Sequence, residues 1–425
     1  MDWSELVAWR RDLHRHAEPG WCEFRTSALV AARLEEWGYQ VQTGAAIVAP
    51  EARMGVPSDA VLEREYRRAL EWGSPEARLA PMRGGLTGVV GTLDSGRPGP
   101  TLGIRFDLDA NDGLAEPDDP AHRPAREGFR SIHPSAQHSC GHDGHTAILL
   151  GVARALAGRR DWRGRLVLIF QPAEEGARGA QAMVAAGVVD GVDVLLAGHI
   201  GANAREVGQV IPGYQQFQAS TKWDATILGR NAHAGIAPHL GHNALLAAAT
   251  ATLNLHAIAR HGAGDTRVNV GTLQAGELRN SVPARAFLRL EVRGDSEETL
   301  GYMAERARQI LESATAMHDC ALQMERVGYT STTPSDPDLV ARIAEVARGV
   351  PGVTRVGGAP DLGAGDDAVL LMQRVQQRGG RAAYLGLGSP VGGGHHTTTF
   401  DFDEQVLTLA AELYLRLALA HLQPA

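Results

Sequence analysis

Two short runs of side chains could together hold a metal ion. Cys140 and His142 place a thiol and an imidazole one residue apart, and Glu174 and Glu175 are adjacent carboxylates. Thiolate, imidazole and carboxylate are the ligand types of zinc and related transition ions. In extended backbone the two glutamates would point to opposite sides. One could then bind metal while the other takes a proton from an activated water.

Each run also has a plain structural explanation. A Cys-x-His pair fits a buried cysteine beside the beginning of a helix, and two glutamates after Pro172 fit a solvated acidic turn. His199 and His396, taken alone, fit satisfied core or surface histidines. Their common position after strand-like runs favours one metal centre instead, because open α/β sheets build their sites beyond the carboxyl ends of strands.

Four apolar, β-rich runs precede these polar side chains. Asp107 and Asp109 follow residues 101–106, the two glutamates follow 166–170, His199 follows 192–197, and His396 follows 382–387. A strongly apolar helix is predicted over residues 145–157, and another over 404–419. This alternation predicts an α/β fold, with a catalytic sheet sandwiched by helices.

Two further features lie near the N-terminus. Residues 4–38 predict a helix pair, or one long helix with a break at Pro19-Gly20. Residues 49–83 predict a charged surface insertion with a helix around 61–72.

A second pattern interrupts the first. Strands over 222–228, 267–273, 286–293 and 321–328, with helices over 242–258 and 297–315, follow the order β-α-β-β-α-β. That order is the split, ferredoxin-like α+β unit, which forms a compact domain of its own. The predicted domains are therefore residues 1–217 with 329–425, and an inserted domain over 218–328.

Length and composition agree with this division. A chain of 425 residues is too long for one ordinary core, and a net charge of −8 argues against nucleic acid or anionic membrane as partners. The three cysteines are few and dispersed, and no signal peptide or long apolar run is evident, so we expect a cytoplasmic protein. Lys222 is the only lysine.

The chemistry-bearing motifs resemble those of a known family. Residues 139–146 (Ser-Cys-Gly-His-Asp-Gly-His-Thr), 171–176 (Gln-Pro-Ala-Glu-Glu-Gly) and 105–110 (Arg-Phe-Asp-Leu-Asp-Ala) are similar to signature blocks of the aminoacylase/carboxypeptidase-G metallopeptidase superfamily. The likeness is to its amidohydrolase branch, which cleaves N-acyl amino acids, and it runs over nearly the whole chain.

The resemblance implies a two-metal site, with manganese as the first expectation and zinc as the alternative. Glu174 would be the general base, and Asp107 and Asp109 would hold ligand histidines in place. His396 rather than His395 fits the family's His-x-x-x-Phe pattern. The implied ligands are Cys140, whose thiolate would bridge the two ions, and His142, Glu175, His199 and His396.

The inserted domain resembles the family's lid and dimerisation domain. His233 matches a histidine that stabilises the oxyanion, in its own chain or across a dimer, and Asn280 and Arg293 match positions that grip the substrate carboxylate. Two departures affect specificity rather than mechanism: Asp366 stands where the family has glutamate, and residues 397–399 (Thr-Thr-Thr) replace an Asn/Ser-Pro segment.

The expected reaction is metal-dependent hydrolysis of the amide between an aromatic acyl group and an acidic amino acid, of the p-aminobenzoyl-glutamate type. Indole-3-acetyl-aspartate hydrolysis and a broader aminoacylase or dipeptidase activity are the alternatives. We expect a homodimer or an assembly with a related second chain. Two alternatives are not enzymes: a structural zinc protein, and a non-catalytic partner of an active enzyme. A single available cysteine is unusual for a structural zinc site.

Overall fold

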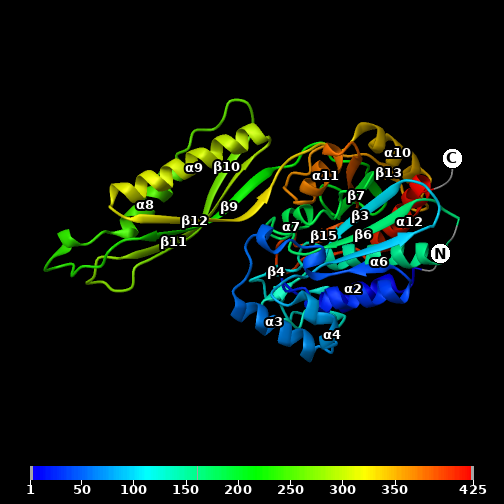
Figure 1. Ribbon diagram of the computed structural model, residues 1–425, viewed down its shortest axis with the longest axis horizontal. Coiled ribbons are helices and arrows are strands. Elements are labelled where there is room, and N and C mark those ends of the chain that lie inside the picture. Colours follow the sequence, from blue (N-terminus) through cyan, green and yellow to red (C-terminus); the bar gives the residue numbers. More distant parts are fainter. Residues whose placement is uncertain (1–2, 160, 423–425) are drawn as a thin grey trace. The chain divides into compact units, whose positions relative to one another are not determined.

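The computed structural model describes residues 3–159 and 161–422, and the chain divides into two compact units. Unit 1 comprises Met1–Gln216 and Thr333–Ala425, and unit 2 comprises Phe217–Thr332. Unit 2 therefore interrupts unit 1 along the chain (Figure 1).

Unit 1 contains a mixed eight-stranded sheet of the order β1-β2-β6-β3-β7-β14-β8-β13. The central strands β6, β3, β7 and β14 are parallel, and β2 joins β6 antiparallel. The central strands are almost wholly buried, which explains their continuous apolar sequences. The sheet consists of β1 (Gln40–Gln42), β2 (Val89–Asp94), β3 (Thr101–Asp107), β6 (Arg165–Gln171), β7 (Val194–Ile200), β8 (Gln209–Ile211), β13 (Arg355–Val356) and β14 (Arg381–Leu387).

Helices cover both faces of this sheet, so the predicted α/β architecture with a central sheet is confirmed. Ile104, Leu168 and Leu196 share one apolar core with α1, α2, α6, α10 and α12. The opposite face, which carries Arg105 and Tyr384, meets the residues just before α11. The helices of unit 1 are α1 (Leu6–Arg15), α2 (Phe24–Glu36), α3 (Asp59–Glu71), α4 (Glu76–Leu79), α5 (Arg123–Arg126), α6 (His142–Ala157), α7 (Ala180–Ala185), α10 (Pro337–Arg348), α11 (Ala368–Gln377) and α12 (Gln405–Leu422).

Short elements complete unit 1. The edge strands β1 and β13, and β8 beside β13, are too short to give a recognisable sequence pattern. Two small antiparallel pairs and three 3-10 turns lie outside the main sheet: β4 (Asn111–Asp112) with β5 (Ala136–Gln137), β15 (Val391–Gly392) with β16 (Asp401–Phe402), and η1 (Gly44–Ala46), η2 (Pro50–Ala52) and η3 (Ala80–Met82).

Helix α6 begins three residues before the predicted residue 145. Gly141 precedes it with φ of 96°, a left-handed conformation that favours glycine, and His142 is the first helical residue. Asp143 lies in the first turn, where a carboxylate is favoured by the helix dipole. This sharp entry places Cys140 and His142 on either side of the left-handed residue.

Unit 2 contains a four-stranded antiparallel sheet of the order β10-β11-β9-β12. Its two helices pack on one face, against Ala225, Ile227 and Leu288, and the other face is polar and carries Lys222. Its elements are β9 (Ala219–Leu228), η4 (Pro238–Leu240), α8 (Ala244–His256), β10 (Thr266–Ala275), β11 (Arg285–Gly294), α9 (Glu297–Met317) and β12 (Ala321–Thr330). Among all the helices described, none is both long and apolar enough to cross a membrane.

Candidate metal centre

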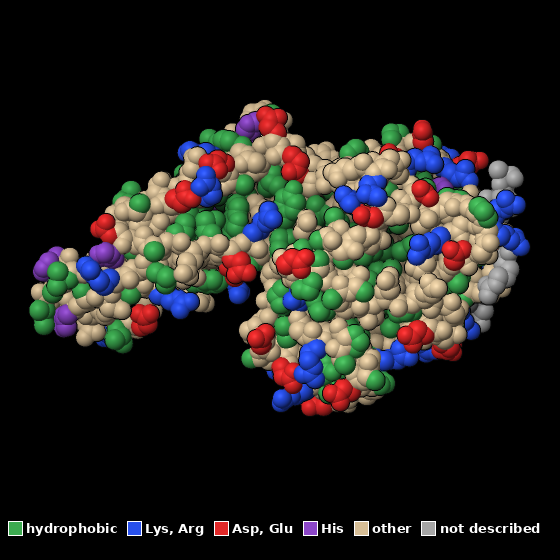
Figure 2. All heavy atoms as spheres, in the orientation of Figure 1, with side chains coloured by type: hydrophobic (Ala, Val, Ile, Leu, Met, Phe, Trp, Pro, Cys, Tyr) green, Lys and Arg blue, Asp and Glu red, His purple; other side chains and the backbone are tan. Residues whose placement is uncertain are grey.

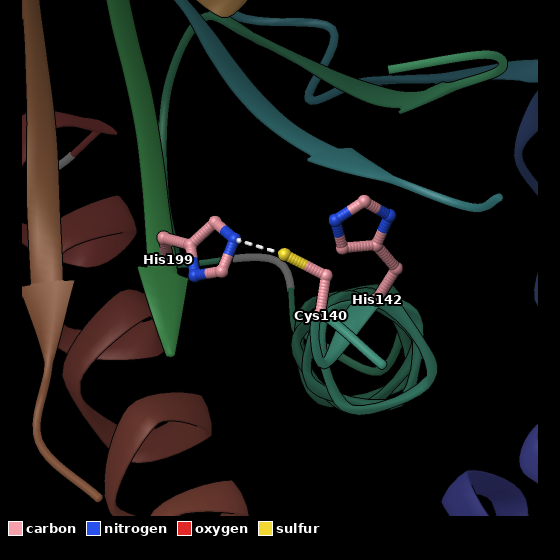
Figure 3. A group of neighbouring side chains, drawn as sticks. All are labelled: Cys140, His142 and His199. Atoms are coloured by element: carbon pink, nitrogen blue, oxygen red, sulfur yellow. Dashed lines mark hydrogen bonds between the residues drawn. The ribbon is translucent and has the colours of Figure 1, made fainter. Parts of the chain in front are cut away.

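Three predicted ligands face one another at the end of the unit 1 sheet. Cys140 lies just before α6, His142 is the first residue of α6, and His199 lies near the end of β7 (Figure 3). The Cys140 Sγ lies 3.3 Å from His199 Nε2. One ligand atom from each of the three residues lies within 4.8 Å of the others. That spacing suits a single ion held between them.

Hydrogen bonds orient both histidines with Nε2 toward this point. His142 Nδ1 donates to the main-chain carbonyl of Asp109 at 2.8 Å, and His199 Nδ1 donates to the carbonyl of Ile200 at 2.8 Å. A carbonyl can only accept, so Nδ1 carries the proton and Nε2 presents a lone pair. This is the arrangement that metal-binding histidines require.

A second group shares the same cysteine. Cys140, Glu175 and His396 also bring one ligand atom each within 4.8 Å of one another, and Glu175 Oε1 lies 3.3 Å from His396 Nε2. Cys140 therefore belongs to two overlapping ligand groups, the geometry that a bridging thiolate would need.

The donor set fits divalent transition ions. His142 Nε2 is buried and has no hydrogen-bond partner among the described residues, which is costly unless something else satisfies it. Burial alone would raise the pKa of the Cys140 thiol. The surrounding imidazoles, of which His199 has the largest effect, instead lower this pKa well below its usual range. A thiolate beside nitrogen and oxygen donors is a typical site for zinc or a related ion.

The two glutamates lie in a turn, so the expectation of extended backbone is wrong. Pro172 ends the strand, and Ala173 follows with φ of 51° in the left-handed region. Residues 174–177 form the turn, and α7 begins after it at Ala180. Buried carboxylates hold it: Glu23 accepts the Ala173 N–H at 2.7 Å, and Asp109 accepts the N–H groups of Glu174 and Glu175 at 3.0 and 2.9 Å.

The turn still brings both carboxylates to the centre. Glu174, Glu175 and His142 form a further group within 4.8 Å, with Glu174 Oε2 3.9 Å from His142 Nε2. Burial, reinforced by the negative charge of Asp366 and of Glu175, raises the pKa of Glu174 well above its usual range. A carboxylate that binds a proton readily is suited to general acid–base work.

Asp107 lies beside the predicted ligand His142, 3.7 Å from its Nδ1, and also binds a neighbouring histidine. Its Oδ1 accepts from His145 Nδ1 at 2.6 Å, and His145 Nε2 accepts the Ile200 N–H at 3.0 Å. Both nitrogens of His145 are therefore occupied, and this histidine does not offer a ligand atom. The fully buried Arg105 ion-pairs with Asp107, 2.9 Å away, and with the two aspartates before α11.

The sequence analysis set aside one candidate contributor, His395, in favour of His396. Its Nδ1 lies 3.6 Å from Cys140 Sγ, and its Nε2 is buried without a partner among the described residues. The family pattern selects His396, yet both members of the His-His pair lie near the thiol. The repeated histidine was the only signal for it in the sequence.

The predicted residues of unit 2 fall at opposite ends of its sheet. His233 bridges Ser281, and the Asn280 carbonyl accepts the Ala234 N–H at 3.0 Å, so these two loops lie together beyond the beginning of β11. Arg293 lies near the other end of β11, where it contacts Glu291 at 2.8 Å. The strand between Arg285 and Arg293 spans roughly 25 Å at the usual rise per residue.

Known proteins resemble this chain over nearly its whole length. Peptidase family M20/M25/M40 matches residues 103–420. The chain is 49% identical over 410 residues to an indole-3-acetyl-aspartic acid hydrolase of Enterobacter agglomerans, covering 96% of this chain and 94% of that protein. It is 48% identical over 417 residues to one of the subunits of p-aminobenzoyl-glutamate hydrolase of Escherichia coli, covering 98% of this chain and 95% of that protein. The crystal structure of an aminobenzoyl-glutamate utilization protein from Klebsiella pneumoniae is similar at a TM-score of 0.84 and 43% identity, covering 98% and 95%.

Proposed function

Because the chain belongs to peptidase family M20/M25/M40, we propose that it hydrolyses the amide bond of N-acyl amino acids, with an aromatic acyl group and an acidic amino acid as the preferred halves. The observation that carries the proposal is the pair of ligand groups that share Cys140, with Glu174 beside them. The three free cysteines favour a reducing compartment, the cytoplasm.

In this proposal two divalent ions occupy the centre, manganese first and zinc as the alternative. Cys140 would be a ligand of both ions, His142 and His199 would complete the ligand set of one, and Glu175 and His396 that of the other. Ions held there supply Lewis-acid polarisation of the amide carbonyl and of a water molecule.

Glu174 then handles the protons. It takes one proton from the water as the new carbon–oxygen bond forms, and it delivers that proton to the amine nitrogen as the carbon–nitrogen bond breaks. The products are a carboxylate and a free amino acid. We propose that His233 donates to the oxyanion of the tetrahedral intermediate and that unit 2 acts as a lid that keeps bulk water away.

Substrate recognition calls for a second chain. Asn280 and Arg293, proposed to hold the substrate carboxylate, are separated by more than the length of an N-acyl amino acid, so one chain cannot offer both to one substrate. We assign His233 and Asn280 to the site of a second copy. Unit 2 has a surface for this: Leu246 and Leu253 of α8 are 48% and 74% exposed, and apolar side chains are visible on the face shown in Figure 2.

The test is hydrolysis by the purified chain with added manganese. The panel is p-aminobenzoyl-glutamate, indole-3-acetyl-aspartate, and acetyl derivatives of neutral amino acids. We expect the first to be cleaved with the highest kcat/KM. The similarity to an indole-3-acetyl-aspartic acid hydrolase makes the second the main rival.

Two other outcomes would point elsewhere. A preference for acetylated neutral amino acids would indicate a general aminoacylase. A chain without bound transition metal and without turnover would indicate a non-catalytic partner of an active enzyme.

A further inference from the structure

Arg178 lies next to the turn that carries Glu174 and Glu175, and only some of its N–H groups donate hydrogen bonds within the chain. It follows Glu175 by three residues, and its Nε–H donates to the main-chain carbonyl of Glu175 at 2.7 Å. One terminal nitrogen donates to the carbonyl of Gly55, in the charged insertion, at 3.2 Å. The side chain is half-buried. An arginine has five N–H donors, so several remain available.

Three segments, two of them distant in the sequence, surround this guanidinium. A Cβ atom at Gly20 would lie 2.3 Å from the second terminal nitrogen of Arg178, so the guanidinium packs directly against the Gly20 backbone. Trp21 Nε1 donates to the carbonyl of Met54 at 2.8 Å and fixes the insertion next to that glycine. The Glu174–Glu175 turn forms the third side, since it carries the carbonyl that receives Nε–H.

The charge of Arg178 is not balanced. The fully buried Arg10 and Arg105 each contact three carboxylates. Within residues 3–159 and 161–422, Arg178 contacts neutral carbonyls and forms no ion pair with a carboxylate. Holding a guanidinium half-buried without a counter-ion is unfavourable, and a carboxylate is the group whose geometry matches its free donors.

We propose that Arg178 binds the side-chain carboxylate of the acidic amino acid in the substrate and so selects glutamate or aspartate over neutral residues. This rests on the proposed function. Arg178 bonds to the main chain of Glu175, not to its carboxylate, so it stands back from the reacting amide. The side-chain carboxylate is the one further from the amide nitrogen. The insertion takes part, because Gly55 holds the same guanidinium.

The experiment compares Arg178→Gln with Arg53→Gln across one acyl series. Glutamine keeps N–H donors but loses the charge. Arg53 is the matched control, because it also holds the insertion through main-chain carbonyls, of Pro50 and Gly84, but lies outside the Arg178 contacts. The substrates are p-aminobenzoyl-glutamate, -aspartate, -glutamine and -alanine.

For Arg178→Gln we expect kcat/KM to fall about 10- to 100-fold on the two acidic substrates and to stay within about twofold on the other two. Arg178→Lys should recover part of the preference because it keeps the charge. An equal fall on all four substrates would mean that Arg178 binds the α-carboxylate or only supports the turn, and would overturn the proposal. So would the same pattern in Arg53→Gln.

A binding measurement separates this proposal from the proposed function. Titration calorimetry on metal-loaded Glu174→Ala protein would compare p-aminobenzoyl-glutamate with p-aminobenzoyl-glutamine, with and without Arg178→Gln. A preference for glutamate that Arg178→Gln removes supports the subsite even if wild-type protein cleaves none of the panel. Hydrolysis by wild type with no such preference leaves the amidohydrolase proposal standing and rejects the subsite.

Discussion

The main-chain carbonyl of Asp109 accepts the Nδ1–H of His142 at 2.8 Å. The carboxylate of the same aspartate accepts the N–H groups of Glu174 and Glu175. One residue thus orients a proposed ligand on α6 and fixes the turn that carries the proposed base and another ligand. Its role is wider than the sequence predicted, because it acts through main chain and side chain together.

Asp109→Asn should weaken metal binding about 10- to 100-fold, as is usual when a partner of the ligands is lost. An amide has one acceptor oxygen in place of two, so one of the two N–H groups loses its bond. Chelator competition measures the affinity. Asp112→Asn, an exposed aspartate nearby, is the control. Unchanged affinity in Asp109→Asn would contradict this role.

Substitutions of Glu174 and Glu175 should have different effects, one on turnover and the other on metal binding. Glu174→Ala should keep metal near the wild-type amount and lose at least about 100-fold in kcat, because the proton carrier is gone. Glu175→Ala should lose metal, because a ligand is gone. Elemental analysis and steady-state kinetics on both variants check this, and an active Glu174→Ala enzyme would remove Glu174 from the mechanism.

The shared cysteine predicts an order of metal loss. His199 belongs to one ligand group and His396 to the other, whereas Cys140 belongs to both. His199→Ala and His396→Ala should each retain about one ion per chain, and Cys140→Ala should retain less than either. Metal analysis after gel filtration gives the stoichiometry. Equal loss in all three variants would speak against two overlapping positions.

Mixing two inactive variants tests the assignment of His233 to a second chain. His233→Ala chains keep an intact metal centre, and Glu174→Ala chains keep His233. Co-refolded or co-expressed, they should form heterodimers with one complete site and recover up to about half the activity per dimer. If His233 serves its own chain, no activity returns on mixing.

His14 predicts a pH dependence of stability. Burial alone would lower its pKa, but bonds to Asp143 at 2.9 Å and Glu116 at 3.0 Å raise the pKa of His14 to about 9. The folded state therefore binds the proton more tightly than the unfolded state, where the pKa is about 6.5. The stabilisation, on the order of 3 kcal/mol, is complete below pH 6.5 and is lost as pH rises through 9.

Thermal unfolding of His14→Gln checks the sign. The variant should be less stable than wild type at pH 6, and the difference should shrink as pH approaches 9 and beyond. His239→Gln, on an exposed loop of unit 2, should follow the wild-type profile. A difference that grows toward alkaline pH would reverse the argument.

The strands and the positions of the proposed ligands could be predicted from local sequence. Apolar runs such as residues 166–170 indicate a buried strand whatever they pack against. It does not carry the Glu174–Glu175 turn. That turn depends on Glu23 and Asp109, which lie far away in the sequence and have no local pattern. The role of Arg178 could not be predicted for the same reason. Gly20 and Gly55 surround its guanidinium, and only the folded chain brings them together.

The two proposed ion positions differ in access to water. The side chain of His142 is 1% exposed, whereas that of His396 is 56% exposed. An ion on the His396 side would exchange quickly with the medium, and one on the His142 side slowly. Dilution or mild chelation would then yield a half-loaded, still folded chain. The outer position would make turnover track the free metal concentration around the protein, while the inner ion stayed in place from one turnover to the next.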